Sequence, residues 1–459
     1  MPALTQMLLS ARDALSAQSY ALGVTGQNIT SSTTPAYVRR EALLENRATG
    51  GVVAVGVRRV ADQFVDRRWL AASSLGASAS EREALLSRVE PLFDDVGGSG
   101  VGTALDQLFS GFSALAANPA DPTTRQALLA RADELAARLR ENADTIASQR
   151  EELLSRAQSV VSEINGKAAQ VADLNRKIAL AEAQGDDASS LRDQRDKLLL
   201  GLSSEIDITT FTDGQGGLVV RAAGTTLVEG DIAQAFEVDL AGDGSLRLSV
   251  AQSGPPAMDV TASLSGGSLA AIKEVRDSDL GSVATQLDQF AWDLAAAVNT
   301  QHAAGFGLDG LGGRALYSIS ATPAGAARAI ALDAQMVGHP ERLAASSLAT
   351  TLPGGSDNAV ALAGLSAQKL FAGNTRTASG SWSDLVGDVG SRVARAREET
   401  ELRQSVQAQV ESLRESVSGV SLDEEMVSLT KYQHAYDAAA KVLATVDELL
   451  RELLDKVGR

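Results

Sequence analysis

The stretch "TTRQALLARADELAARLRENADTIASQREELLSRAQSVVSEINGKAAQVADLNRKIALAEA" (Thr123–Ala183) decides the fold. It contains no proline, and Gly166 is its only glycine, so no residue in it is expected to end a helix. A helix of ~60 residues is ~90 Å long at 1.5 Å per residue. Such a rod cannot bury its apolar stripe alone, so we predict antiparallel partners, and residues 186–206 are the first of them.

Both ends of the chain carry apolar residues at intervals of seven positions. Near the N-terminus they are Leu8, Leu15, Leu22 and Ile29, and near the C-terminus they are Leu422, Leu429, Tyr436, Leu443 and Leu450, with Met426 beside them. This spacing is typical of coiled-coil helices. Residues 1–60 hold six basic and three acidic residues (+3), whereas 420–459 hold five basic and eight acidic residues (−3). These opposite charges favour pairing of the two helices.

Two interpretations of these stripes stay open. In the first, the two helices form an ordinary hairpin that closes one domain. In the second, they stay unfolded in the monomer until other subunits cover their stripes, so that folding is coupled to assembly. The second interpretation predicts mobile ends in the isolated chain.

The composition changes at residue 207. From 207 to 268, short runs of Val, Thr and Leu are separated by Asp-Gly, Gly-Gly and Pro-Pro turns, which predicts a small antiparallel β domain. The predicted fold class is mainly α with this inserted β domain, paired terminal helices and a long helical-bundle body. Further helices are expected at about 62–95, 269–304 and 382–417, and short strands at 315–321 and 327–333.

The predicted domain organisation has five segments. They are the N-terminal axial helix and motif loop (1–60), the first half of the helical body (61–206), the β domain (207–268), the second half of the body (269–417, irregular or β at 305–380) and the C-terminal axial helix (418–459).

The composition argues against several classes of function. A net charge of −17 disfavours nucleic acid and anionic membranes as partners, because both are polyanions. The chain has no cysteine, which excludes thiol catalysis, thiolate metal sites and disulfides. No stretch reaches the ~18 apolar residues of a membrane span, and the N-terminus lacks the pattern of a cleaved secretory signal.

Candidate catalytic groups do not converge in the sequence. His302, His339 and His434 are far apart, and we expect packing or surface roles for them. "GGSGVG" (97–102) is not followed by Lys-Ser/Thr, so it is predicted to be a flexible connection and not a phosphate loop. "RDQRD" (192–196) has the spacing of helical ion pairs and is predicted to be a solvated or helix–helix salt-bridge face. We therefore expect no catalytic residue, no cofactor, no metal and no enzyme activity.

The stretch "NITSSTTPAYVRR" (28–40) follows the first stripe, and its proline is expected to end that helix. It resembles the N-terminal motif of the bacterial flagellar axial proteins, the family of rod, hook and hook-associated proteins. The matching residues are Asn28, Ile29, Thr34, Pro35, Tyr37 and Arg39. Ala36 stands where the family has glycine, at a turn that would need φ > 0. Tyr37, Arg39 and Arg40 are our candidates for contacts between subunits.

Other stretches extend this resemblance over most of the chain. "SLDEEMVSLTKYQHAYDAAA" (421–440) is similar to the C-terminal end of the same family. "NPADPTTRQALLARADELA" (118–136), "LRDQRDKLLLGLSSEIDI" (191–208) and "AAAVNTQHAAGFGLDG" (295–310) resemble one branch of it, the hook-associated proteins 1 at the junction of hook and filament.

The resemblance implies a structural protein of the extracellular flagellum, exported by the flagellar type III pathway without a cleaved signal peptide. It implies self-assembly into a ring on the hook tip, with the hook protein and the next hook-associated protein towards the filament as partners. It also implies an export chaperone on about 420–459. A chain of 459 residues is short for this family, so we expect an outer domain to be reduced or missing.

Two alternatives remain at this point. Another axial protein (hook, distal rod or hook-associated protein 3) would share the two ends but not the internal stretches. A secreted enzyme with flagellar-type termini would need a catalytic group within 207–380.

Overall fold

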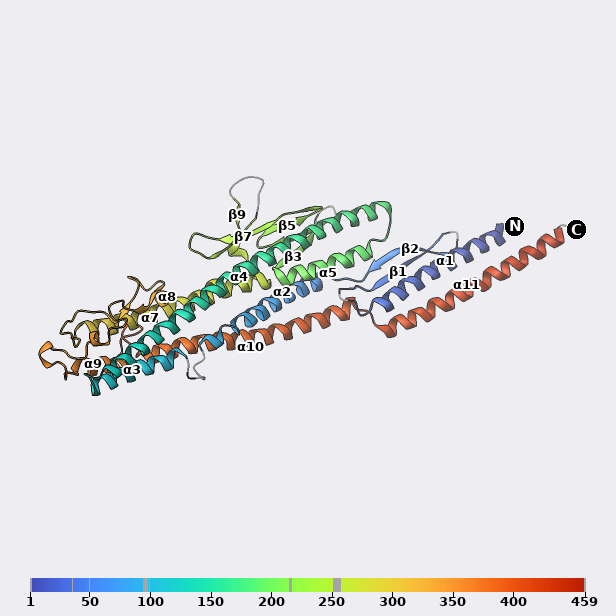
Figure 1. The fold of residues 1–459 in the computed structure, drawn as a ribbon. Helices are drawn as coiled ribbons and strands as arrows, with labels where there is room; N and C mark the ends of the chain where they lie inside the picture. The colour runs from blue at the N-terminus through green and yellow to red at the C-terminus, as the bar shows by residue number, and fades with distance from the viewer. Residues whose placement is uncertain are drawn as a thin grey trace.

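The computed structural model describes the chain except for Met1, Pro35, Thr49, 94–97, Ser99, 214–216, 251–256 and 458–459. The molecule is an elongated, mainly helical rod with both termini at one end (Figure 1). Three predicted features lie wholly or partly outside the described residues: Pro35 of the motif, the glycine-rich connection at 97–102 and the Pro-Pro turn of the β domain.

The long predicted helix is α4 (Pro122–Gln184), which spans 63 residues. Asp121 caps its start by accepting hydrogen bonds from backbone N–H groups of the first turn, and Gly185 ends it with a left-handed φ of 80°. One stripe of α4 is buried from Leu128 to Ile178. The prediction of one continuous helix is therefore confirmed.

Several further helices complete the body. They are α2 (Gln63–Leu86), α3 (Val101–Ala117), α5 (Ser189–Glu205), α6 (Gly267–Lys273), α7 (Leu280–Ala303) and α10 (Ala378–Ser418). As predicted, α5 turns back along α4 (Figure 1). The structure also shows that α2 lies along α10. Four aromatic rings pack together in the core, with centroids 5.5–5.9 Å apart: Phe93, Phe290, Phe371 and Trp382.

The structure corrects three predicted helix boundaries. α2 ends at Leu86 and not near residue 95, and a 3-10 turn containing Pro91 follows it. α10 starts earlier than predicted because the Thr377 hydroxyl accepts a hydrogen bond from the Gly380 N–H and caps the helix. The helix expected over 269–304 is interrupted by a π-helical segment, Glu274–Asp279, between α6 and α7.

Tertiary contacts surround this π-helical segment. Arg276 donates a hydrogen bond to the Arg150 carbonyl at 3.1 Å. Asp279 is 1% exposed and accepts hydrogen bonds from Arg82 and Arg392. These partners lie on α4, α2 and α10, so local sequence spacing alone could not indicate the interruption.

Residues 207–268 form two antiparallel sheets, which confirms the predicted β insertion. The first contains β3 (Ile208–Thr212), β4 (Leu218–Ala222), β5 (Thr225–Glu229) and β6 (Ile232–Ala233), and the second contains β7 (Phe236–Leu240), β8 (Leu246–Val250) and β9 (Met258–Asp259). Asn165 of α4 exchanges two hydrogen bonds with the Phe236 backbone, and Asn175 donates to the carbonyls of Leu218 and Gly230. The insertion is thus fastened to the long helix.

The stretch 305–380 is largely irregular, as predicted. Its short elements are β10 (Tyr317–Ser318), α8 (Ala326–Ala329), β11 (Ala331–Leu332) and α9 (Asp357–Gly364). β10 pairs with β11, so the two strands expected here are present but only two residues long.

The terminal part of the rod contains α1 (Pro2–Ser31), the hairpin of β1 (Arg40–Asn46) and β2 (Val52–Arg59), and α11 (Leu422–Val457). α1 and α11 lie side by side and run in opposite directions (Figure 1). Among the described residues, no helix is long and apolar enough to cross a membrane.

Candidate assembly interface

The predicted stripes lie on the paired helices α1 and α11. Half-buried members are Leu8, Leu15, Leu22, Ile29, Leu429, Leu443 and Leu450. Leu422 and Met426 are each 52% exposed and Tyr436 is 39% exposed. Both helices are complete and paired in the single chain, which matches the hairpin interpretation, yet part of the apolar stripe remains uncovered.

The line of α11 that is buried most deeply is not the predicted stripe. It passes through Glu425 and Val446, each only 3% exposed, with the half-buried Tyr432 and Ala439 between them at intervals of seven. The predicted stripe runs beside this line. Several of its side chains are therefore available to other molecules.

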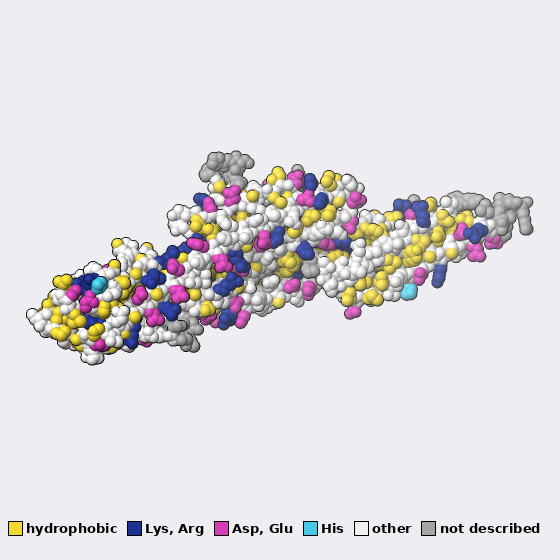
Figure 2. Space-filling model, in the orientation of Figure 1, with side chains coloured by type: hydrophobic (Ala, Val, Ile, Leu, Met, Phe, Trp, Pro, Cys, Tyr) yellow, Lys and Arg dark blue, Asp and Glu magenta, His cyan; other side chains and the backbone are white. Residues whose placement is uncertain are grey.

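The terminal helices expose an extended apolar surface. Its largest exposed side chains are Met7, Leu9, Tyr20, Leu422, Met426, Val427, Tyr436, Val442, Leu449 and Leu453. Figure 2 shows apolar side chains running along this end of the rod, with charged groups mostly at its margins. Extended apolar surfaces of this kind mark protein–protein interfaces.

Asn28 organises the motif loop between α1 and β1. It is 1% exposed, its amide donates to the Arg40 carbonyl at 2.8 Å, and its side-chain oxygen accepts from the Arg40 N–H at 3.0 Å. The same oxygen accepts a hydrogen bond from the Tyr37 hydroxyl at 2.9 Å. One buried side chain thus fixes the turn that leads from the terminal helix into the hairpin.

The backbone at Ala36 has φ = 64°, the left-handed conformation expected where the family has glycine. Ala36 is buried, and Thr34, two positions earlier, is exposed. The positive φ shows that the turn is kept although alanine carries a Cβ atom.

Arg39 joins the motif loop to the start of α11. Its guanidinium group lies 2.9 Å from a carboxylate oxygen of Glu424 and 3.1 Å from one of Glu425, and its N–H donates to the Ser418 carbonyl at 2.9 Å. These contacts hold the two ends of the chain together at the base of the terminal helices.

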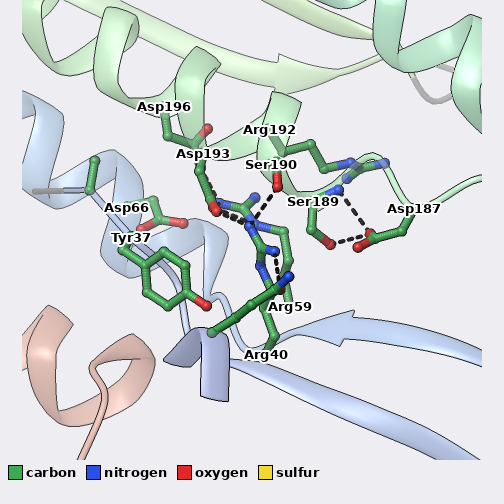
Figure 3. Close-up of polar contacts among 12 residues, drawn as sticks. Tyr37, Arg40, Arg59, Asp66, Asp187, Ser189, Ser190, Arg192, Asp193 and Asp196 are labelled. Carbon is green, nitrogen blue, oxygen red and sulfur yellow. Dashed lines mark hydrogen bonds and ion pairs between the residues drawn. The ribbon is translucent and has the colours of Figure 1, made fainter. Parts of the chain in front are cut away.

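Arg40 and Arg59 join the hairpin to α5 through two aspartates (Figure 3). Arg40, which is 6% exposed, pairs with Asp193, and Arg59 lies 2.7 Å from Asp193 and 2.6 Å from Asp196. Burial by itself would lower the pKa of Arg59, but the charges and hydrogen bonds of Asp196 and Asp193 raise it above its usual value. Two arginines thus share the carboxylate of Asp193, and Arg59 also has that of Asp196.

The predicted salt-bridge face at 192–196 belongs to this cluster. Arg192 pairs with Glu182 of α4, and Arg195 donates to the Asn175 side chain at 2.9 Å. Burial lowers the pKa of Arg195 to about 10. The face does join helices, but Asp193 and Asp196 find their partners in the hairpin, more than 130 residues away in sequence.

Arg414 of α10 contacts both α2 and the motif loop. Its guanidinium group lies 4.1 Å from the centre of the Trp69 ring, 3.3 Å from Asp66 and 3.4 Å from the Ala36 carbonyl. Burial raises the pKa of Asp66, and Arg414 offsets part of that rise. Neither Arg414 nor Arg59 was singled out by sequence patterns.

Tyr37, Arg39 and Arg40 were predicted to contact other subunits. Within the chain, Tyr37 contacts Asn28, Arg39 contacts Glu424 and Glu425, and Arg40 contacts Asp193, while contacts with other subunits stay a prediction. Their polar groups fix the terminal helices to the body.

The three histidines have different surroundings. His302 is 1% exposed, its Nδ1 lies 2.7 Å from the Arg314 carbonyl, and its Nε2 accepts a hydrogen bond from the Ala344 N–H. Burial lowers its pKa, so it packs as a neutral ring. His339 pairs with Glu341, and His434 is exposed on α11. Within the described ranges, no group of three or more His, Cys, Asp or Glu residues could hold a metal ion.

Comparisons with known proteins place this geometry in context. The family described as "Flagellar hook-associated protein FlgK helical domain" matches residues 86–317, which is 232 of the 459 residues. The family described as "Flagellar basal body rod FlgEFG protein C-terminal" matches residues 414–456, which cover α11.

Individual relatives agree with these families. The chain is 24% identical to flagellar hook-associated protein 1 of Escherichia coli (strain K12), over 98% of this chain and 100% of that protein. It is 25% identical to flagellar hook-associated protein 1 of Bacillus subtilis (strain 168), over 98% of each. The fold is similar to the flagellar hook junction protein FlgK from Burkholderia pseudomallei, with a TM-score of 0.70 and 17% identity, over 77% of this chain and 100% of that one.

Proposed function

Because this chain belongs to the FlgK family of flagellar hook-associated proteins, we propose that it is the structural protein that assembles on the hook tip and connects the hook to the filament. The relatives that match it over almost the whole chain are named flagellar hook-associated protein 1. This favours the junction protein over another axial protein and over an enzyme with flagellar-type termini.

The observation that carries the proposal is the terminal pair of helices. α1 and α11 expose an apolar surface at one end of the rod, and five arginine and aspartate side chains (Arg40, Arg59, Arg414, Asp193 and Asp196) fix their base to the body. A surface of this kind is suited to packing against copies of the same chain and against other axial proteins. Its role is geometric, and no step of bond-making chemistry is needed for it.

The finer assignments follow from the same role. We propose self-assembly into a ring, contacts with the hook protein below and with the next hook-associated protein above, and an export chaperone on residues 420–459. We also propose export through the flagellar type III pathway without cleavage. The assembly residues would be those of the two stripes, and the five predicted segments would be the working units of the chain.

The shortness of the chain relative to its family supports the expectation of a reduced outer domain. The alignment with the Escherichia coli relative spans 546 positions, whereas this chain has 459 residues. That relative therefore carries segments that are missing here. We propose that they belong to an outer domain, because both terminal helices and the helical body are present.

A deletion strain tests the function. We expect hooks without filaments, filament monomers in the medium, and rescue by the full chain but not by a chain lacking 420–459. The truncated protein should still be soluble and helical, as measured by circular dichroism. Normal filaments in the deletion strain would refute the proposed function.

A further inference from the structure

The C-terminal half of α10 is covered on one side only. From Thr400 to Ser418 its buried residues are Thr400, Val410, Arg414 and Ser418, which lie on the side that packs along α2. At a helical spacing of 3.6 residues per turn, this leaves two other faces of the same helix exposed.

The two exposed faces of this helix differ in chemistry. One carries Glu401, Gln404, Ala408, Glu411 and Glu415, all exposed, and has the charged character of a solvated face. The other, which we call the α10 stripe, carries Leu402, Val406, Gln409, Leu413, Ser416 and Val417 and has no charged residue. Leu402 is 60% exposed, Val406 and Leu413 are each 39% exposed and Val417 is 36% exposed.

The spacing of the α10 stripe is that of a helix-packing seam. Residues 402, 406, 409, 413 and 416 follow one another at intervals of four and three, as in a coiled coil. The stripe is ~22 Å long at 1.5 Å per residue. Single exposed apolar residues are ordinary, but four on one face without a charge are typical of an interface core.

Two observations point to a second copy of this chain as the occupant. The stripe ends at Val417, and the exposed Leu422 and Met426 of α11 follow within nine residues, so along the chain it is next to the surface proposed for assembly. The chain also has a second exposed helix face, at Phe64, Arg68, Ala71 and Leu75 of α2, whose intervals of four, three and four match those of the stripe, with Arg67 lying over the Phe64 ring. By helical geometry, Phe64 and Leu75 lie about 160–180° around α2 from Asp66, which faces α10.

We propose that the α10 stripe packs against the outer face of α2 in a neighbouring copy. Because the two surfaces differ, the contact is heterologous and can pass from copy to copy around an assembly. This inference rests on the proposed function and adds a lateral contact of the helical body to that of the terminal helices.

Photo-crosslinking in assembled flagella tests the contact directly. A benzophenone amino acid at position 413 should give adducts of twice the chain mass, and mass spectrometry should locate the second end in α2 of another copy. The same group at position 408, on the charged face, should give no such adduct, and position 436 on α11 serves as a positive control. Adducts of position 413 with another flagellar protein, or none while position 436 reacts, would overturn the proposal.

A pair of variants tests whether the contact matters. Val406→Lys with Leu413→Lys should reduce the fraction of cells with filaments at least tenfold, whereas Ala408→Lys should leave it unchanged. All these sites are exposed, so the melting temperature of the purified monomer should stay within ~2 °C of wild type. Normal filaments in the double variant, with none in the deletion strain, would refute the α10 contact and leave the proposed function intact. Filaments in the deletion strain itself would refute both.

Discussion

Asp193 holds two arginines, and its removal should loosen the terminal helices from the body. The Asp193 side chain is 15% exposed, and its partners Arg40 and Arg59 are 5% and 13% exposed. Removing one partner of a buried ion pair costs about 3–5 kcal/mol. Arg59 keeps Asp196 at 2.6 Å, whereas Arg40 keeps Ser190 at 3.3 Å, Gln27 at 3.1 Å and the Tyr37 ring at 5.2 Å, none of which is a carboxylate. We therefore expect the lower end of that range, about 3 kcal/mol, for Asp193→Ala.

The effect should be local, because Asp193 joins α5 to the hairpin and not to the core of the body. Amide hydrogen exchange of β1 measures it in the purified monomer. A loss of about 3 kcal/mol corresponds to an increase of about 100-fold in the rate of exchange through local opening. Exchange in the middle of α4 should not change.

Asp173→Ala is the matched control for Asp193→Ala. Asp173 lies on exposed α4 surface and pairs with Arg176 and Lys177, so its loss should leave exchange of β1 at the wild-type rate. If Asp193→Ala also leaves exchange of β1 within twofold of wild type, the buried pairs do not fasten the terminal helices, and the reasoning fails.

Three further predictions concern the body and the motif loop. Ala36→Gly should stabilise the chain by about 1 kcal/mol, because glycine adopts the left-handed conformation without strain, and Ala36→Val should destabilise it. Thermal melting measures both changes, and equal melting temperatures of the three proteins would contradict the prediction. Burial raises the pKa of Glu205 to about 7, so the folded state binds its proton more tightly than the unfolded state does, and this contribution to stability is lost as the pH rises through 7. The urea midpoint of wild type relative to Glu205→Gln should therefore be lower at pH 8 than at pH 5, and a difference independent of pH would contradict this. His302→Ala leaves the Arg314 carbonyl and the Ala344 N–H unpaired, so it should cost about 2–4 kcal/mol in urea unfolding but leave exchange of α1 unchanged.

The sequence predicted those features whose causes are local. The ends of α4 were found within about one residue because Asp121-Pro122 is a strong start signal and the stretch from Thr123 to Ala183 has no proline and a single glycine. The antiparallel sheets followed from the turn residues between short apolar runs. At Ala36 the motif position indicated a left-handed turn while the residue itself argued against it, because an alanine Cβ is strained there, and the structure keeps the turn.

Features that depend on tertiary contacts were missed or misplaced. A straight α-helix drifts ~20° per heptad relative to a strict seven-residue repeat, so residues seven apart do not all face one partner. The stripe through Leu422 and Tyr436 is partly exposed, while Val446, on the line beside it, is buried by packing that the sequence pattern does not specify. The pairing of Arg40 with Asp193 joins positions 153 residues apart, and no local pattern specifies it.

The contacts of Arg39, Arg40 and Arg414 explain why an assembly helix needs polar contacts at its base. Apolar packing is nondirectional and tolerates small rotations, whereas the pairs of Arg39, Arg40 and Arg414 need particular positions of α11, α5 and α2. The pairs of Arg39 and Arg40 tie the motif loop and its hairpin to α11 and α5, and the hydrogen bond of Arg414 to the Ala36 carbonyl ties the loop to α10. Together these contacts limit rotation of the terminal helices about the rod. Copies that join through these helices would then all hold the body in the same orientation. The α10 stripe would consequently meet α2 of the neighbouring copy at a fixed position. Loss of Asp193 should consequently weaken the lateral contact as well as the hairpin, even though Asp193 lies in neither apolar surface.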